Sequence, residues 1–377
     1  MKIAFIGGRT FHHPDGIATF MKNLATELVT MGHEPIVYQE SDHNGTEIVN
    51  GFKVVHQKSY KSAALTKILL GFKATLKALF KEKGVQVFHY NCGGPAMIAS
   101  FWPRLFGRIS LIQFHGLEFN RSKYSPRKQK LVRMLFCFDC KMNKHLTAVS
   151  QEQTDYIREH FHKYCRTIKC AVNLPEEEHK SNVLERFGIK PNNYIVFMGR
   201  HEQDKNPDYL IRGFMASEHG DKQLVICGCA APGSDFEEKL HEIAKSDKNV
   251  IFTGAIFDAD KDTIFRNAWA FCLPSTMEGL PISLLEGMSY GKVCIASDIP
   301  ANKEALGESG VWVKKEDDQS MTDALNDLYA HYNNYSSQGQ VNLKRVKELF
   351  SWRRTAEEYN DFISSLANNQ KDMKLIC

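Results

Sequence analysis

Two glutamates, Glu278 and Glu286, stand eight positions apart in the stretch EGLPISLLEGMSYGKVCIASD, which covers residues 278–298. Gly279 and Pro281 follow the first glutamate, and the second lies within an apolar run that is typical of a buried helix. An unpaired buried charge is costly, so these surroundings favour a binding role for Glu286 over a solvated rim position. On a continuous helix, eight residues span about 12 Å and leave the side chains about 80° apart. Both carboxylates are therefore expected to reach one elongated ligand.

Two cations, Arg200 and Lys205, lie in the polar stretch MGRHEQDKNP directly after a predicted strand. Arginine binds phosphate groups bidentately and lysine adds a compact charge, so the pair suits a diphosphate. Two solvated loop cations are the alternative interpretation. Pro281 suits the first position of a helix, whose N-terminal N–H groups would donate to an anion or to sugar hydroxyls.

Short apolar runs alternate with longer helical patterns in both halves of the 377-residue chain. This alternation is typical of parallel sheets with crossover helices. Predicted strands are KIAFIG, EPIVYQ, VQVFHY, ISLIQFHG and HLTAVS in the first half, and NYIVFMG, QLVICG, NVIFTG, WAFCLP and KVCIAS in the second. The fold class is therefore α/β, with two doubly wound, Rossmann-like domains expected to face each other across a cleft. Ligands of such sheets bind at the carboxyl ends of the strands.

Several motifs of the second half occur together and in a fixed order. They are Gly199-Arg200 and Lys205, then Pro274-Ser275, Glu278-Gly279-Leu280-Pro281, Glu286-Gly287-Met288 and Gly291. This series resembles the donor-site signature of the retaining GT-B glycosyltransferases of family four (group 1), whose paired glutamates have the same separation. The resemblance covers nearly the whole chain and is strongest over 195–315. The stretch HGLEFNRSKY also resembles bacterial capsule, exopolysaccharide and lipopolysaccharide transferases.

The first half carries two further parts of the resemblance. Asp15-Gly16-Ile17 resembles the family's glycine loop, which approaches the phosphates and the acceptor, although this chain has one glycine where the family often has two. QFHGLEFNR resembles the family's His-Gly segment, so the resemblance places His115 against the donor sugar. A lone histidine would otherwise be interpreted as a core or loop residue.

The resemblance also implies how the chain is divided. Residues 1–172 would form the acceptor-side domain and residues 194–345 the nucleotide-sugar-binding domain. The segment 173–193 between them is interpreted as a linker because it is polar and contains two prolines. Residues 346–377, which include Trp352, would form a C-terminal helix that crosses back to the first domain.

The activity implied by the resemblance is transfer of a hexose-type sugar from a nucleotide-diphosphate sugar to a glycan acceptor, with retention of configuration. The expected catalytic residues are His115, Glu278, Arg200 and Lys205. Donor binding is expected from Gly16, Arg200, Lys205, Glu278, Gly279, Leu280, Pro281 and Glu286, with Glu286 on the ribose. No cofactor or metal is expected, and a UDP-sugar is the default donor.

Charge divides unevenly between the halves. Residues 1–180 carry 26 Lys and Arg against 15 Asp and Glu, whereas the remainder carries 22 against 29. Residues 58–83 contain seven lysines and one acid, and residues 121–144 contain eight basic residues and one acid. Basic amphipathic helices can lie on anionic membranes, which suggests a lipid-linked acceptor. For 65–80, a crossover helix with solvated lysines is the favoured alternative.

The remaining features indicate a protein of the cytosol that can contact the inner face of the membrane. The N-terminus reads as a buried strand rather than a signal peptide, and no run is long enough to span a membrane. Ten scattered cysteines, including the pair Cys137 and Cys140, are interpreted as reduced thiols.

Three other functions remain as alternatives. A sugar-nucleotide epimerase or a phosphorylase would share the architecture, but neither its base constellation nor a lysine-bound cofactor motif is recognised. A catalytically inactive binding protein could keep the fold. A nucleic-acid binder is disfavoured because the scattered lysines lack interleaved aromatic residues.

Overall fold

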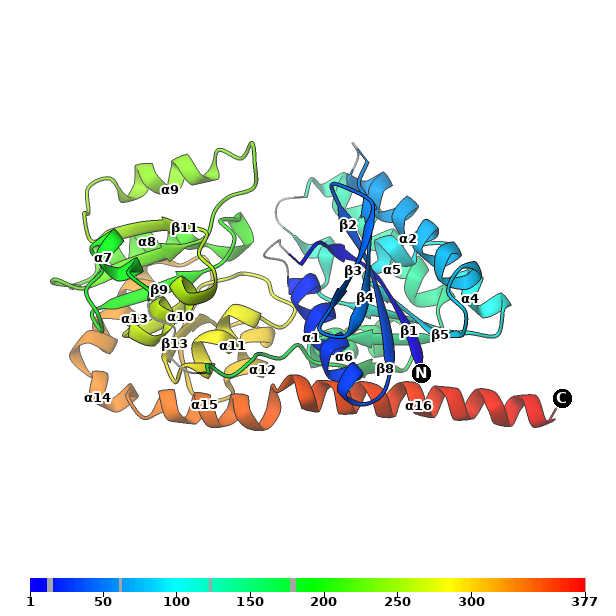
Figure 1. The fold of residues 1–377 in the computed structure, drawn as a ribbon. Helices are drawn as coiled ribbons and strands as arrows, with labels where there is room; N and C mark the ends of the chain where they lie inside the picture. The colour runs from blue at the N-terminus through cyan, green and yellow to red at the C-terminus, as the bar shows by residue number, and fades with distance from the viewer. Residues whose placement is uncertain (12–15, 61–62, 122–123, 177–180, 377) are drawn as a thin grey trace. The chain divides into compact units, whose positions relative to one another are not determined.

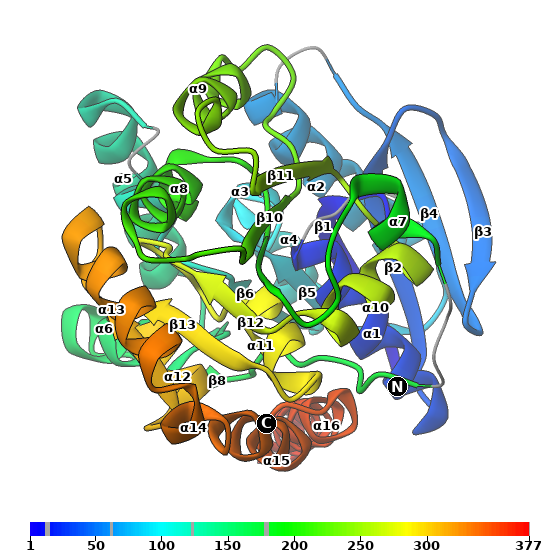
Figure 2. The ribbon, with the colours of Figure 1, turned by 90° about the vertical axis from the view of Figure 1, so that its left-hand side faces the viewer.

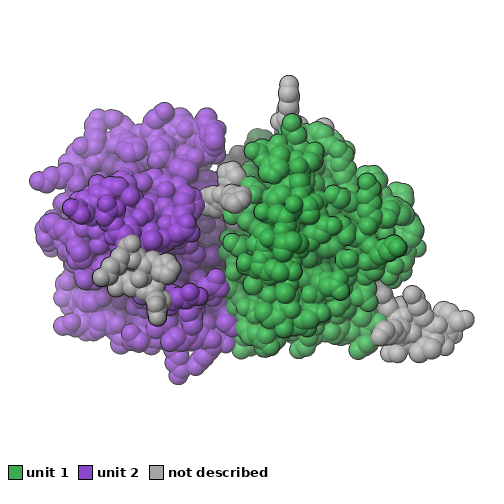
Figure 3. All heavy atoms as spheres, in the orientation of Figure 1, with its two compact units in different colours: residues 1–119, 124–171, 352–377 green, residues 120–123, 172–351 purple. Residues whose placement is uncertain are grey.

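The computed structural model describes residues 1–11, 16–60, 63–121, 124–176 and 181–376. The chain folds as two compact units, coloured green and purple in Figure 3. Unit 1 consists of residues 1–119, 124–171 and 352–377, and unit 2 consists of residues 120–123 and 172–351.

Unit 1 contains an eight-stranded sheet in the order β3-β4-β2-β1-β5-β6-β7-β8. All neighbours are parallel except β3 and β4, which pair antiparallel. The strands are β1 (Lys2–Arg9), β2 (Glu34–Ser41), β3 (Gly45–Val49), β4 (Phe52–Lys58), β5 (Val85–Asn91), β6 (Ile109–Phe114), β7 (His145–Ala148) and β8 (Cys165–Thr167).

Helices cover both faces of this sheet, as Figure 1 shows. They are α1 (Gly16–Thr30), α2 (Ala63–Phe80), α3 (Gly93–Ala96), α4 (Phe101–Leu105), the 3₁₀ helix η1 (Glu118–Asn120), α5 (Pro126–Met142), α6 (Gln151–Phe161) and α16 (Trp352–Ile376). Successive residues of β1 point to opposite faces. Ala4 and Ile6 join the core formed with α2, α3, α5 and α6. Phe5 faces α16 instead, with its ring 6.0 Å from that of Tyr359.

The C-terminal helix α16 packs within unit 1. Its first residue, Trp352, lies with its ring 6.0 Å from that of Phe20 on α1. The hydroxyl of Tyr359 is 3.0 Å from Nδ1 of the buried His89. The long segment of unit 2 thus begins at residue 172, and the polypeptide returns to unit 1 at residue 352. No helix in the described ranges is both long and apolar enough to cross a bilayer.

Unit 2 contains a six-stranded, fully parallel sheet in the order β11-β10-β9-β12-β13-β14, part of which is visible in Figure 2. The strands are β9 (Tyr194–Met198), β10 (Gln223–Cys227), β11 (Val250–Gly254), β12 (Ala270–Leu273), β13 (Val293–Ser297) and β14 (Gly310–Val313). Numbered within the unit, this is the 3-2-1-4-5-6 order of doubly wound sheets.

The helices of unit 2 connect these strands. They are α7 (Val183–Phe187), the 3₁₀ helix η2 (Gln203–Lys205), α8 (Pro207–Ala216), α9 (Phe236–Ala244), α10 (Asp258–Asn267), α11 (Ile282–Ser289), α12 (Pro300–Leu306), α13 (Asp318–Ala330), α14 (Tyr332–Tyr335) and α15 (Gln338–Leu349). The segment 173–193, interpreted as a linker from its polar composition, groups with unit 2 and contains α7.

The α/β fold class and all ten predicted strands are confirmed, since each apolar run coincides with a strand. Four strands were not predicted: β3, β4, β8 and β14. The short β8 and β14 lie at sheet edges, and β3 is exposed along most of its length. The sequences of β3 and β8 lack the continuous apolar run of a central parallel strand, whereas β14, GVWV, is apolar but only four residues long.

Candidate active site

The sheet order of unit 2 identifies the place where a ligand would bind. Strand β9 pairs with β10 on one side and with β12 on the other. From β9 to β11 the successive strands are added toward one edge of the sheet, and from β12 to β14 they are added toward the other edge, so the strand order reverses between β9 and β12. A crevice opens at the carboxyl ends of strands where the order reverses in this way. The loops that follow β9 and β12 carry Arg200, Lys205 and Glu278.

The loop after β9 is held in place by the neighbouring loop after β10. The amide of His201 donates to the carbonyl of Cys229 at 2.9 Å. Gly228 has a φ of 134°, and a Cβ at that position would lie 1.8 Å from the carbonyl oxygen of Gly199. Only glycine permits this close approach.

The same loop is also joined to the loop after β12. The side chain of Asn206 donates to the carbonyl of Pro274 at 3.0 Å, and the amide of Thr276 donates to the carbonyl of Asp204 at 2.9 Å. Asn206 and Pro207 occupy the N-cap and the first helical position of α8, although the Asn206 side chain forms no cap hydrogen bond. These contacts fix the two loops beside each other.

Lys205 and Glu278 form an ion pair across the two loops. Their side chains are only 18% and 9% exposed, so the pair is largely shielded from water. Arg200 is more exposed and donates to Glu202 at 2.7 Å. The structure therefore brings Lys205 and Glu278 together at the predicted edge of the sheet, with Arg200 on the same loop as Lys205.

Glu286 lies on α11, and its carboxylate accepts from Nζ of Lys261 on α10 at 2.5 Å. Helix α11 begins at Ile282, with Pro281 at the N-cap position, so the prediction that Pro281 is the first helical residue is wrong by one position. Residues 278–281 are not helical, and the 12 Å and 80° separation predicted for a continuous helix does not apply. Gly279 and the buried Leu280 form the bend that leads into α11.

Each charged residue predicted for the donor site thus has a partner of opposite charge within unit 2. The pairs are Arg200 with Glu202, Lys205 with Glu278, and Lys261 with Glu286. A diphosphate and a ribose would offer these side chains replacement partners, because phosphate oxygens accept from cations and hydroxyls donate to carboxylates. The arrangement suits a ligand with an anionic centre and polar ends.

His115 follows β6 in unit 1, and its Nε2 lies 3.1 Å from Oδ1 of Asn91 at the end of β5. Its ring also contacts Phe20 edge-on at 5.1 Å. The neighbouring His89 is fully buried, and burial together with the charge of His115 lowers the pKa of His89 well below 6.5. His115 therefore lies at the carboxyl edge of its sheet, as the position after a strand predicts.

The glycine loop is only partly described. Gly16 is the first residue of α1, and Asp15 lies outside the described residues. Just before this loop, Gly7 has a φ of 102°, and a Cβ there would lie 2.7 Å from Cγ of Pro95. Glycine at the end of β1 therefore lets the strand pass close to the start of α3.

Two acidic or thiol patterns could suggest a metal. Asp258 and Asp260 have an Asp-x-Asp spacing, but Asp260 accepts from Arg186 at 2.5 Å and from Ser181. Cys137 and Cys140 are free thiols, and burial raises the pKa of Cys140. Within the described ranges, no three His, Cys, Asp or Glu side chains are grouped as a metal site would need.

Sequence reasoning missed two groups at this site. Lys261 lies in the charged stretch DADKDTIFRN, which reads as a solvated helix surface and gives no signal of a partner on α11. His201 is buried, and its Nδ1 lies 2.6 Å from Glu237 on α9. Glu237 also accepts from the amide of Ala230 at 2.9 Å, so it links the loops after β9 and β10.

Two family models match the chain in succession. The model "Glycosyltransferase Family 4" matches residues 14–176, and "Glycosyl transferases group 1" matches residues 180–344. Together they cover most of both units and every residue predicted for the catalytic and donor-binding site, but not β1 or α16.

Curated relatives are similar over part of their length. The O-antigen chain mannosyltransferase RfbU of Salmonella typhimurium strain LT2 is 23% identical over 54% of this chain and 58% of that protein. The UDP-Gal:alpha-D-GlcNAc-diphosphoundecaprenol alpha-1,3-galactosyltransferase of Escherichia coli is 25% identical over 64% of this chain and 65% of that protein. The chain thus matches less than two thirds of either relative.

Solved structures share the fold over nearly the whole chain. Sucrose-phosphate synthase from Thermosynechococcus elongatus superposes with a TM-score of 0.82 at 17% identity, covering 98% of this chain and 99% of that one. Anabaena Alr3699/HepE, solved with UDP and glucose, gives a TM-score of 0.78 at 14% identity, covering 97% and 100%.

Proposed function

Because the chain belongs to the group 1 glycosyltransferases of family 4, we propose that it moves a hexose-type sugar from a nucleotide-diphosphate sugar to a glycan acceptor. The observation that carries the proposal is the Lys205–Glu278 ion pair, which lies where the strand order of unit 2 reverses. A cation and a carboxylate at that edge could bind the two halves of a sugar diphosphate.

Arg200 and Lys205 act on the diphosphate in this proposal. Negative charge grows on the leaving phosphate as its bond to the anomeric carbon breaks. Fixed cations aimed at that charge stabilise the transition state more than the ground state. Both cations lie on the loop that Gly228 and Asn206 hold in place, so the backbone that carries them is positioned before the donor binds.

The carboxylates bind hydroxyl groups at the two ends of the donor. Glu278 accepts from sugar hydroxyls close to the reacting carbon, and Glu286 accepts from the ribose. The backbone of Gly279, Leu280 and Pro281 leads into α11, whose first-turn N–H groups have no partner within the helix and can donate to the ligand. Lys261 holds Glu286 in position until the ribose is bound.

Unit 1 supplies the remaining groups. His115 contacts the donor sugar, and Gly16, at the start of α1, approaches the phosphates. An acceptor hydroxyl then attacks the anomeric carbon on the face from which the nucleoside diphosphate departs, and its proton passes to the phosphate oxygen that leaves. We assign no side chain as a covalent nucleophile. The transfer retains the anomeric configuration and needs no metal ion or other cofactor.

A lipid-linked glycan of cell-surface polysaccharide synthesis is the proposed acceptor. Support comes from the relatives, one of which is named for an O-antigen chain and another for a diphosphoundecaprenol acceptor. A uridine nucleotide is the proposed donor because that second relative is named for UDP-Gal and a structural relative was solved with UDP.

Thermal unfolding with a panel of nucleoside diphosphates tests the donor site. A ligand at about a hundredfold its Kd stabilises the folded chain by roughly 2.7 kcal/mol, which raises the melting temperature measurably. UDP should raise it in the native chain and much less in Glu286→Ala, whereas Glu308→Ala, which removes an exposed carboxylate, should behave like the native chain. Radiolabelled UDP-hexose and a diphosphoundecaprenol-linked acceptor then test transfer. Absence of any nucleotide effect would overturn the proposed donor site.

A further inference from the structure

The amphipathic helix singled out in the first half of the sequence packs against the sheet. Thr66, Leu70, Ala74 and Ala78 of α2 are buried, and the helix contacts β1 and β5. This confirms the favoured alternative for residues 65–80, a crossover helix whose apolar face covers the sheet. Among the side chains that are described, those of residues 66–80, only Phe80 at the end of the helix is an exposed large hydrophobic one. Most of α2 is therefore not available to a membrane.

Helix α5 differs because it has two apolar stripes. Phe136, Asp139 and Cys140 face the core and are buried. On the other side Leu131, Met134, Phe138 and Met142 follow helical spacing and are between 45% and 59% exposed. A helix of a soluble domain needs only one apolar face to pack. Because the other side of α5 already packs on the core, packing within the described part of unit 1 does not account for the outer stripe.

The outer stripe of α5 continues onto α4 and the end of α2. Arg104 on α4 donates to the carbonyl of Met142 at 2.7 Å, and its guanidinium lies 5.2 Å from the ring centre of Phe101. Beyond α4, the ring of Phe106 contacts that of Phe80 at 5.5 Å. We call this surface the apolar-basic face. Its exposed apolar members are Phe80, Ile98, Phe101, Leu105, Phe106, Leu131, Met134, Phe138 and Met142.

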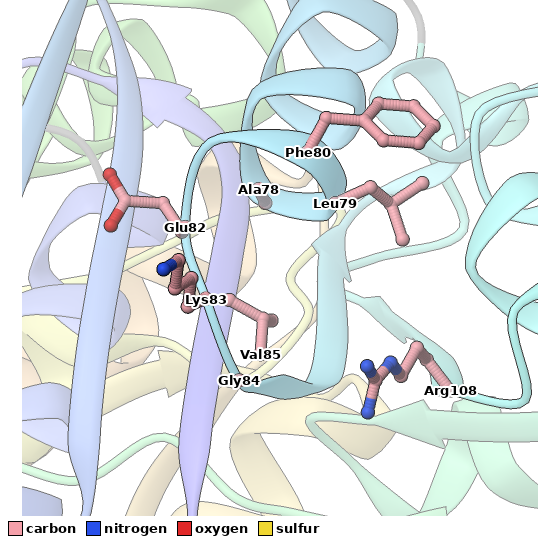
Figure 4. A pocket seen from close by; sticks show the side chains of 8 residues that line it. All are labelled: Ala78, Leu79, Phe80, Glu82, Lys83, Gly84, Val85 and Arg108. Carbon is pink, nitrogen blue, oxygen red and sulfur yellow. The ribbon is translucent and has the colours of Figure 1, made fainter.

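A shallow hollow of about 230 Å³ adjoins the apolar-basic face where α2 ends and β5 begins. Figure 4 shows Leu79 and Phe80 on one side of it and Arg108 on the other. Its lining combines apolar side chains with the cationic Lys83 and Arg108 and the acidic Glu82.

Charge on the apolar-basic face is almost entirely positive. Residues 77–83, 98–108 and 126–144 contain eleven Lys and Arg and two acids. Neither acid is an exposed, unpaired charge: Asp139 is buried, and Glu82, which lines the hollow, is 13% exposed in its side chain and pairs with Lys53 at 2.5 Å. Nine of the basic residues are exposed, namely Lys81, Lys83, Arg108, Arg127, Lys128, Lys130, Arg133, Lys141 and Lys144.

We propose that the apolar-basic face binds an anionic phospholipid surface, with the outer stripe of α5 inserted among the headgroups. Exposed apolar side chains flanked by cations, without exposed acids, match the interface of an anionic bilayer. The concentration of these side chains is specific to this face. Among the described residues, nine of the fifteen exposed large hydrophobic side chains belong to it, and unit 2 has only three.

Co-sedimentation with vesicles tests the proposal without donor or acceptor, so its outcome is independent of the proposed transferase activity. The full chain should sediment with vesicles of phosphatidylcholine and phosphatidylglycerol at low salt. It should be released as salt shortens the range of the electrostatic attraction. Vesicles of phosphatidylcholine alone should retain much less. Equal retention by both kinds of vesicle, or by neither, would overturn the proposal.

Variants separate the apolar and the cationic contributions. Met134→Ser with Phe138→Ser, and Lys130→Glu with Arg133→Glu, should each weaken binding to anionic vesicles about tenfold or more. Val341→Ser and Lys248→Glu replace exposed residues of unit 2 and should bind like the native chain. All of these side chains are exposed, so melting temperatures should be unchanged.

Phe138→Trp provides a direct measure of insertion. Its added fluorescence should shift to shorter wavelength and be quenched by brominated phosphatidylglycerol, above the signal of the native tryptophans. A second copy of the chain is the competing occupant. If sedimentation velocity showed a dimer that Met134→Ser with Phe138→Ser dissociates, and vesicles were not bound, the apolar-basic face would be a protein interface and the proposal would be wrong.

Discussion

Lys205 donates to the carboxylate of Glu278 across 73 positions of sequence, because the two residues follow strands that are neighbours in the sheet of unit 2. The pair satisfies both charges in the absence of a ligand. A donor diphosphate would compete with Glu278 for Lys205, and sugar hydroxyls would compete with Lys205 for Glu278. Binding of the diphosphate to Lys205 and binding of the sugar hydroxyls to Glu278 are therefore coupled through this ion pair.

Glu278→Gln separates binding from transfer. The substitution removes the carboxylate that competes for Lys205, so the affinity for a nucleoside diphosphate should be kept or should rise several-fold. Transfer should fall about a hundredfold or more, as when one preorganised electrostatic group is lost. Isothermal titration with UDP and a transfer assay measure the two effects. Transfer by Glu278→Gln at the native rate would remove Glu278 from the catalytic residues.

Lys205→Ala leaves the Glu278 carboxylate largely buried without its partner. The expected loss is about 1–3 kcal/mol in the free energy of unfolding. Because removal of both partners leaves no unpaired charge, Lys205→Ala with Glu278→Ala should lose less than the sum of the single changes. Urea unfolding of the four proteins gives the coupling. The exposed pair Arg353 and Glu357 on α16 is the matched control and should show almost none.

Features of this site that depend on neighbouring residues could be predicted from the sequence, whereas contacts between distant segments could not. Strands are encoded by local apolar runs, and the loops after them carry Arg200, Lys205 and Glu278 as expected. The sheet order, which places β12 beside β9, arises from packing between distant segments. For that reason Lys261 and Glu237 could not be predicted. Lys261 reaches Glu286 only because of where α10 packs, and Glu237 reaches His201 only because of where α9 packs.

The geometry between the two glutamates shows where local reasoning fails. Pro281 is predicted to be the first residue of a helix, but the helix begins one residue later, at Ile282. A separation calculated for an unbroken helix therefore has no meaning for Glu278. The charge of residues 121–144 was likewise recognised, whereas the outward stripe of α5 was not, because the sequence does not show which of two apolar faces is buried.

Glu286→Ala should abolish the preference for ribose over 2′-deoxyribose. Loss of a carboxylate that accepts from ribose hydroxyls should weaken binding of UDP about tenfold or more, and that of 2′-deoxy-UDP much less. Lys261→Ala retains the carboxylate and should retain the preference. Equilibrium titration with both nucleotides measures it. An undiminished preference in Glu286→Ala would place the ribose elsewhere.

Gly228→Ala should displace the loop that carries Arg200. The new Cβ would meet the carbonyl oxygen of Gly199, so the chain must either lose stability or move the loop. Gly233 also has a positive φ but nothing within 4 Å of a Cβ, so Gly233→Ala isolates the backbone strain, about 1–2 kcal/mol. Thermal unfolding should show a larger loss for Gly228→Ala, together with a smaller stabilisation by UDP. Equal losses would show that the close approach is unimportant.

Asp139 should make unit 1 less stable as the pH rises. Burial raises the pKa of its carboxyl from 3.8 to about 7, so the folded chain holds a proton that the unfolded chain releases. The free energy of unfolding therefore falls as the pH rises from about 4 to about 7. Above that range, the ionised and buried carboxylate lowers it by a constant amount.

Asp139→Asn removes this titration, and its stability relative to the native chain should rise across the same range, by up to about 4 kcal/mol. Urea unfolding at a series of pH values measures the difference. Asp361→Asn, which replaces an exposed carboxylate on α16, should show no such trend. A flat difference between Asp139→Asn and the native chain would mean that Asp139 is ionised in the folded protein, with a partner that offsets its burial.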